Sequence, residues 1–211
     1  MSLSLGNTER RADPMTTTRV LGIAAVILAV LVQTACSYNY ARSFIRPTYR
    51  PSLFNYAAAG RDLRVDTQGN PFAASIDQQA DFGTVVTALM QDRNWGARTN
   101  FTASPGESAR PQYRVVVVFD PVEPAPYSAL CNGTVRTGPT EGRIRVRAAF
   151  CETVSSGPRV LTGVRGNLVP EATVESPEFA ALMAGVTRDL FPIWDADFDD
   201  DDCPSFVIFC H

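Results

Sequence analysis

The stretch Tyr113-Arg-Val-Val-Val-Val-Phe119 decides the fold class of this 211-residue chain. Its apolar residues continue without polar alternation over the length of one strand. Such a run is typical of a strand covered on both faces, because a half-exposed strand alternates apolar and polar side chains. We therefore expect residues 113–119 to form a central strand of a sheet.

Neighbouring segments carry further strand signals. Residues 144–150 alternate, which directs one set of side chains toward a core and leaves arginines outside; the inward set is Ile144, Val146, Ala148 and Phe150. Ser155-Ser-Gly-Pro158 marks a hairpin turn into residues 159–169. Residues 62–66 form another short strand candidate, since the turn cluster Gln-Gly-Asn-Pro follows.

Two segments have the spacing of amphipathic helices. Ser75-Ile-Asp-Gln78 resembles a capping box, so we expect a helix over residues 75–94 that ends before Gly96. Ser176-Pro-Glu predicts a second helix over residues 176–191. Serine is a favoured N-cap residue, proline suits the first turn of a helix, and glutamate is stabilised by the positive N-terminal end of the helix dipole. The apolar stripe of this second helix contains Phe179, Leu182, Met183, Val186 and Leu190.

The order of these elements predicts an α+β domain over residues 61–192. We expect an antiparallel sheet of about four to five strands, with the helices over residues 75–94 and 176–191 packed on one face. The sequence contains no internal repeat and no sign of a second domain.

Composition excludes several kinds of catalysis. All 19 basic residues are arginine, and the single histidine is the terminal His211. Schiff-base chemistry and phosphate-binding lysines are therefore excluded. A single histidine in a terminal position, which is held poorly, disfavours Ser-His-Asp triads and multi-histidine zinc sites. Carboxylate chemistry remains, with Asp66, Asp120 and Glu123 as candidates, but no sequence pattern pairs them. We expect no enzyme activity and no cofactor; the alternative is a carboxylate-based cell-wall glycoside hydrolase.

The N-terminus has the form of an export signal. Arg19 precedes an apolar run over residues 20–32, and Gln33-Thr-Ala-Cys36 follows. These 13 residues are fewer than the roughly 20 that span a bilayer. We expect residues 1–35 to be a signal peptide, and residues 1–14 can be an over-extended start because Met15 begins a compact signal. A retained signal anchor is the alternative.

This hydrophobic run, followed by small residues and a cysteine, resembles the lipobox of bacterial lipoprotein precursors. Thr34, Ala35 and Cys36 fit the pattern, whereas Gln33 stands where that family prefers an apolar residue. The resemblance implies cleavage before Cys36 and attachment of lipid to its sulfur. Ser37 follows the cysteine, which the enteric sorting pattern associates with the outer membrane.

Cysteine usage supports the same compartment. With Cys36 assigned to lipid, four cysteines remain, an even number that suits disulfide bonding in an oxidising periplasm. Four cysteines allow three connectivities, and we prefer the local one, Cys131 with Cys151 and Cys203 with Cys210.

Residues 36–60 combine aromatic residues and arginine without an acid and without a clear period. We interpret them as a lipid-anchored tether. Three interpretations stay open: an arm in the lipid headgroup zone, a strap that docks on a partner, or a tether whose aromatics pack back onto the domain. The candidate interface residues are Tyr38, Tyr40, Arg42, Arg46 and Arg50.

Arg143, Arg145 and Arg147 recur at alternate positions and so share one face of the expected strand. They can meet an anionic partner such as a phosphate-bearing lipid, and a solvated sheet face is the alternative. Nucleic acid is not an expected partner, because residues 36–211 contain 16 arginines and 20 acidic residues.

Residues 193–211 form an acidic tail. Asp195, Asp197 and Asp199 begin like a calcium loop, but Asp200 stands where the loop needs glycine and Phe206 where it needs glutamate. We therefore expect no metal site, with weak calcium binding as the alternative to a solvated tail.

Together these features predict a bacterial envelope lipoprotein on the periplasmic face of a membrane. The layout resembles that of small accessory envelope lipoproteins. That resemblance implies a binding or structural role beside an envelope protein partner.

Overall fold

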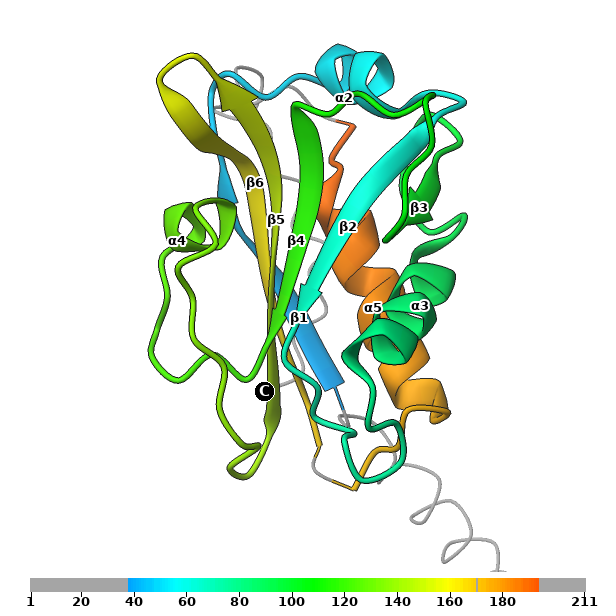
Figure 1. The fold of residues 1–211 in the computed structure, drawn as a ribbon, viewed down its shortest axis with the longest axis vertical. Helices are drawn as coiled ribbons and strands as arrows, with labels where there is room; N and C mark the ends of the chain where they lie inside the picture. The colour runs from blue at the N-terminus through cyan, green and yellow to red at the C-terminus, as the bar shows by residue number, and fades with distance from the viewer. Residues whose placement is uncertain (1–37, 170, 194–211) are drawn as a thin grey trace, which may run out of the picture. The chain divides into compact units, whose positions relative to one another are not determined.

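A computed structural model describes residues 38–169 and 171–193. Its centre is a six-stranded sheet with the strand order β1-β6-β5-β4-β2-β3 (Figure 1). The strands are β1 (Tyr38–Ile45), β2 (Asp62–Gln68), β3 (Asn100–Thr102), β4 (Tyr113–Phe119), β5 (Ile144–Val154) and β6 (Gly157–Leu168). The helices are α2 (Pro51–Ala58), α3 (Gln79–Met90), α4 (Tyr127–Cys131) and α5 (Pro177–Leu190).

The α+β class is confirmed, but the expected antiparallel sheet of four to five strands is wrong. Strands β4, β5, β6 and β1 pair antiparallel, whereas β2 pairs parallel with both β3 and β4. Parallel pairing arises because α3 carries the chain back past the sheet before β3 begins, and parallel neighbours need such a crossover. The sheet is therefore mixed and has six strands.

The central strand β4 forms over the expected residues and is buried on both faces. One face packs Val115, Val117 and Phe119 into the main core, and the other packs Val116 and Val118 into a smaller core. This arrangement explains the unbroken apolar run, because neither face of the strand meets water.

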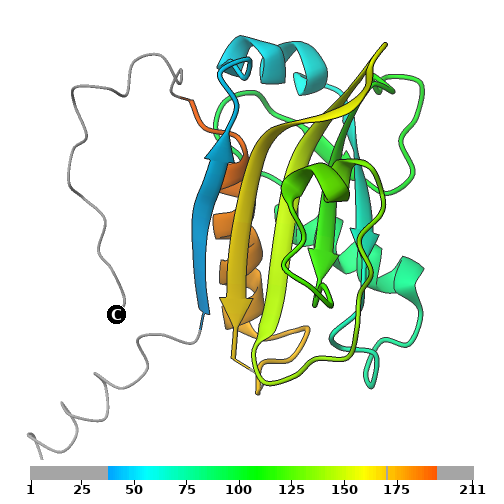
Figure 2. The same ribbon diagram turned by 90° about the vertical axis from the view of Figure 1, so that its left-hand side faces the viewer.

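Helices α3 and α5 cover the main-core face, and α4 covers the opposite face (Figure 2). The main core is rich in stacked and edge-on phenylalanines. Phe54 of α2 stacks on Phe191 at a centroid distance of 4.3 Å, and Phe179 of α5 contacts Phe72 at 5.0 Å. We call the α4 side of the sheet the outer face.

Helix α5 begins as the sequence predicts, since the Ser176 hydroxyl accepts a hydrogen bond from the Phe179 amide. Helix α3 is shorter than the expected 75–94. The Ser75 hydroxyl donates to the Phe72 carbonyl within a preceding turn, so it does not cap the helix, and Gln78 is the N-cap residue.

From residue 38 onward, the expected tether over residues 36–60 forms part of the domain instead. Residues 38–45 are the strand β1, which pairs with β6, and residues 51–58 form α2. Pairing with β6 supplies the backbone hydrogen bonds that a tether would take from water. Gly185 on α5 lets the ring of Tyr40 lie close to the helix, because a Cβ at that position would overlap the ring.

Several expectations lie outside the described residues. These are the signal peptide over residues 1–35, the lipid site Cys36, the sorting residue Ser37, the pair Cys203 and Cys210, and the acidic positions Asp195, Asp197 and Asp199. Within residues 38–169 and 171–193, no helix has the length and apolarity that a bilayer span requires.

Candidate functional site

A disulfide holds α4 against the outer face. Cys131 at the end of α4 bonds to Cys151 of β5, with a Cα–Cα distance of 5.7 Å. Both residues are buried among Val116, Val118 and Leu130. The expected local pairing of these two cysteines is confirmed. The bond ties the insertion between β4 and β5 to the sheet.

Three arginines lie together on the outer face. Arg145 and Arg147 alternate with buried inward residues on β5, as the sequence predicts. The register places Arg165 of β6 directly opposite Arg147. We call Arg145, Arg147 and Arg165 the arginine triad. Arg143, which the sequence groups with Arg145 and Arg147, precedes β5 in an exposed position.

Sequence reasoning missed Arg165. Its outward position follows from the alternation of Val164 and Gly166 toward the core, but only the β5–β6 register shows that it faces Arg147. Two like charges in directly opposed positions destabilise a sheet unless a counter-ion lies nearby.

Arg147 is fixed more firmly than the other two members. Its guanidinium donates to the Ala125 carbonyl and lies 5.5 Å from the ring centroid of Tyr127. The Tyr127 ring in turn packs over Gly163, where a Cβ would come within 2.7 Å of the ring. Arg147 is half-buried, whereas Arg145 and Arg165 are exposed.

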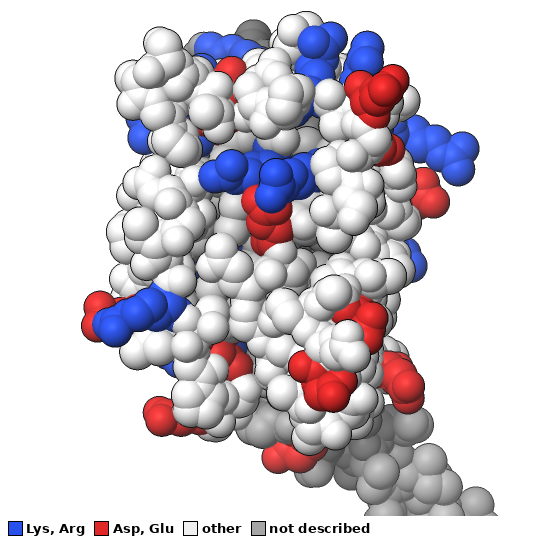
Figure 3. Space-filling view, in the orientation of Figure 1, with Lys and Arg blue, Asp and Glu red and all other residues white. Residues whose placement is uncertain are grey.

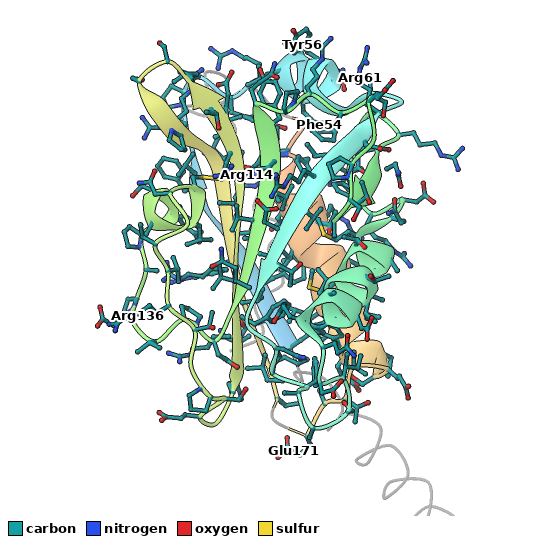
Figure 4. The ribbon with its side chains drawn as sticks, viewed as in Figure 1. Phe54, Tyr56, Arg61, Arg114, Arg136 and Glu171 are labelled. Carbon is teal, nitrogen blue, oxygen red and sulfur yellow. A yellow bond between two sulfur atoms is a disulfide. The ribbon has the colours of Figure 1, made fainter. Side chains whose placement is uncertain are left out.

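Arg64, Arg114 and Arg136 of the outer face already have acidic partners. Asp66 pairs with Arg64 at 2.6 Å and with Arg114 at 3.5 Å. Glu123 pairs loosely with Arg136 at 3.8 Å. Figure 4 shows Arg114 over the middle of the sheet and Arg136 projecting from the loop beside α4. Their charges are therefore largely balanced locally.

A shallow hollow lies beside α4, with a volume of about 160 Å³. Its lining includes Val122, Glu123, Pro126, Val135 and Arg136. Glu123 is the only carboxylate in this lining. Glycoside hydrolysis requires two carboxyl groups across a cleft, and this hollow does not bring two together.

The other two carboxylate candidates are engaged elsewhere. Asp66 is held in the ion pairs with Arg64 and Arg114. Asp120 is 2% exposed, and its carboxylate accepts from the Arg145 amide and from the Thr140 hydroxyl. Both groups stabilise local structure through these contacts.

The end of the domain at α2 carries two half-exposed aromatic side chains. Tyr56 is 51% exposed and lies under the guanidinium of Arg110, 3.6 Å from its ring centroid. Trp95 is 49% exposed and lies 5.5 Å from the guanidinium of Arg188. The turn after Trp95 lies beside α2, because a Cβ on Gly96 would contact the side chain of Asn55. We call Tyr56, Arg110, Trp95 and Arg188 the α2-end surface.

A buried carboxylate lies under this end. The Tyr113 hydroxyl donates to Glu152 at 2.9 Å, and the Arg159 guanidinium donates to the other carboxylate oxygen at 2.7 Å. Burial, reinforced by the hydrogen bond to Glu152, raises the pKa of Tyr113 to about 12. Both oxygens of Glu152 have partners, so this group stabilises the end of the sheet.

The expected interface residues of the arm do not form one exposed strip. Tyr38 and Tyr40 are half-buried against the main core, and Arg42 lies 3.9 Å from the Asp189 carboxylate. Arg46 is exposed beside Phe44, and Arg50 donates to the Tyr49 carbonyl. The interpretation in which the aromatics pack back onto the domain is the one that agrees with β1.

Charge is unevenly distributed along the domain. Acidic side chains gather over the lower half of the face seen in Figure 3, where α3 and α5 begin. Exposed acids of that end include Asp77, Asp81, Glu171 and Glu175. Figure 4 shows Glu171 at this end and Tyr56 with Arg61 at the opposite end. Within the described ranges, no group of three or more His, Cys, Asp or Glu residues could hold a metal ion.

No protein-family model and no curated protein matches the chain. Among solved structures, it is similar to the PelC dodecamer from Paraburkholderia phytofirmans. The TM-score is 0.39 and the identity is 12%, over 72% of this chain and 96% of that one. A point variant of the same dodecamer gives a TM-score of 0.37 and 13% identity, over 72% and 97%. Likeness of this extent does not assign a function.

Proposed function

We propose that the chain is a lipid-anchored bacterial envelope lipoprotein whose domain acts by binding, as an accessory to a larger envelope assembly. The observation that carries this proposal is the stretch Thr34-Ala35-Cys36 at the end of a short apolar run. The sulfur of Cys36 carries a diacylglyceryl group through a thioether bond. The lipid holds the domain on the periplasmic face of the membrane.

The buried disulfide supports an exported protein. Disulfides persist in oxidising compartments such as the periplasm and are rare in the cytosol. The bond between Cys131 and Cys151 accounts for two of the four cysteines that remain after Cys36 is assigned to lipid.

The α2-end surface supports a protein partner. Tyrosine, tryptophan and arginine are the residues most enriched among the energetically dominant positions of interfaces. Here two aromatic rings are half-exposed, and each has an arginine guanidinium over its face. Rings that are already ordered lose little conformational entropy when a partner covers them.

The anchor and the α2-end surface lie at opposite ends of β1. Tyr38 pairs with Leu168 at the end where β6 finishes, and the chain runs along β1 toward α2. Cys36 precedes Tyr38 by two residues, which reach at most about 7 Å. A lipid on Cys36 therefore holds the start of β1 beside the bilayer and leaves the α2 end accessible.

Fatty-acid labelling tests the anchor. Cells express the wild-type chain or Cys36→Ser with a clickable fatty acid, and membranes are then separated from soluble fractions. We expect label and membrane association only with the wild type. Cys131→Ser is the matched control, because it removes a cysteine from the domain and leaves Cys36 in place. Label that survives Cys36→Ser, or no label on the wild type, overturns the anchor.

Site-specific photo-crosslinking tests the partner surface. A photoreactive amino acid replaces Tyr56 on α2 or Ala88 on α3, which is also exposed. We expect a discrete membrane-protein adduct from position 56 and none from position 88. Equal adducts from both positions, or no adduct from position 56, contradict a partner on the α2-end surface.

A further inference from the structure

The arginine triad has no acidic partner in the domain. Among residues 38–169 and 171–193, none of Arg145, Arg147 and Arg165 forms an ion pair with a carboxylate. The neighbouring carboxylate of Asp120 is buried and already accepts two hydrogen bonds. The triad therefore leaves three positive charges on the outer face, whereas Arg64, Arg114 and Arg136 are paired with carboxylates.

The spacing of the triad suits several separate anionic groups. Arg145 and Arg147 lie two residues apart on β5, which separates their Cα atoms by about 7 Å. Arg147 and Arg165 are directly opposed on adjacent strands, about 5 Å apart. Arg145 and Arg165 are exposed and Arg147 is half-buried, so at these separations the three guanidinium groups can meet different headgroup phosphates of an anionic surface.

The triad also lies close to the anchor. Asn39 pairs with Asn167 of β6, and Asn167 pairs with Arg145 of β5. Asn39 follows Cys36 by three residues, which span at most about 11 Å, and two strand spacings add about 10 Å. Arg165 lies within a similar reach, because it pairs with Ala41 on β1.

An apolar side chain accompanies these charges. Val122, in the loop that borders the hollow on the outer face, is 52% exposed and is flanked by Pro121 and Glu123. Clustered arginines near a membrane surface are attracted to anionic lipid, by about 1 kcal/mol for each charge. The exposed acids Asp77 and Asp81 belong to α3 and the loop before it, in the helix layer on the other side of the sheet, and Glu123 on the outer face is paired with Arg136.

We propose that the outer face lies against an anionic phospholipid surface, with Arg145, Arg147 and Arg165 contacting the headgroup phosphates. This inference rests on the proposed lipid anchor, because Cys36 brings the outer face to the membrane. The helix layer then faces away from the bilayer. Lipid at Cys36 supplies the attachment, and the triad sets the orientation of the domain.

Vesicle binding by an unacylated chain tests the triad apart from the anchor. The chain from residue 36 with Cys36→Ser is sedimented with vesicles of phosphatidylglycerol and phosphatidylcholine, or of phosphatidylcholine alone, at low salt. We expect binding only to the anionic vesicles. Each surface arginine contributes about fivefold to binding, so Arg145→Gln with Arg165→Gln lowers the partition coefficient about 30-fold. This pair leaves the packed Arg147 intact, and lysine at both positions retains binding.

Arg93→Gln with Arg98→Gln is the matched control. Both arginines are exposed in the segment between α3 and β3, and their removal changes the net charge equally. We expect this variant to bind as the parent chain does. An equal loss in the control, binding to neutral vesicles, or binding of inorganic phosphate without binding of anionic vesicles overturns the proposal. Fatty-acid labelling of Cys36 is unaffected by any of these results, so the anchor and the triad fail separately.

Discussion

Substitution of Gly185 tests whether residues 38–45 belong to the folded domain. In an exposed helix, Gly→Ala stabilises a protein by about 1 kcal/mol, because alanine has the higher helix propensity. A Cβ on Gly185 would lie 2.5 Å from Cδ1 of Tyr40 and nearer to the next ring atoms. Ordinary carbon contacts are about 3.5–4.0 Å, so the Tyr40 ring must move by more than about 1 Å.

The gain in helix propensity and the overlap with the Tyr40 ring change the stability of the domain in opposite directions. Overpacking of this kind costs about 1–3 kcal/mol, so we expect Gly185→Ala to lower the free energy of unfolding by about 1 kcal/mol. In the background Tyr40→Ala, the overlap is absent and the same substitution raises stability by about 0.5–1 kcal/mol. The coupling between the two positions is then about 2 kcal/mol.

Urea unfolding of the chain with Cys36→Ser measures all four members of this cycle. Equal m-values show that the substitutions change stability and leave the surface exposed on unfolding unchanged. If Gly185→Ala stabilises the chain with Tyr40 present, the ring does not lie on α5. The placement of β1 in the sheet is then refuted.

Two further predictions concern the disulfide and the buried tyrosine. The bond between Cys131 and Cys151 closes a loop with a sequence separation of 20, and we expect its loss to lower the free energy of unfolding by about 3 kcal/mol. Unfolding of the double serine variant, and of the parent chain with and without reductant, measures this change. An unfolding midpoint that does not change when the disulfide is lost contradicts this prediction. Ultraviolet titration shows one tyrosine that ionises with a pKa of about 12, and Tyr113→Phe removes it. Because the folded pKa exceeds the unfolded value of about 10, the stability due to Tyr113 is complete below pH 10 and declines toward pH 12 in the parent chain only.

The sequence predicts the elements whose signals are local. The apolar run of β4, the alternation of β5 and the Ser176 cap all depend on residues close together in the chain, and each forms where expected. The pairing of Cys131 with Cys151 also follows from short separation. These elements account for the antiparallel centre of the sheet and for one helix.

The remaining parts depend on distant contacts. Strand β1 has no clear period, because its side chains meet α5 on one face and the sheet register is interrupted between Arg42 and Phe44. The parallel pairing of β2 with β4 depends on the path of α3, which residues 62–66 alone do not encode. Local spacing could not reveal that these segments complete the sheet.

The same limit applies to the candidate site. Two members of the arginine triad alternate on one strand and are visible in the sequence, but Arg165 joins them only through the β5–β6 register. Tyr56 and Trp95 belong to segments about 40 residues apart, and tertiary packing brings those segments to one end of the domain. Surfaces built from several segments require the fold before they can be recognised.

Intact-mass spectrometry of the protein purified from membranes tests the lipid anchor most directly. We expect a chain that begins at Cys36, contains disulfide-bonded cysteines and carries the added mass of a diacylglyceryl group. A chain that retains residues 1–35 without lipid identifies a signal anchor instead. An unmodified chain that begins at Cys36 or later contradicts the lipoprotein.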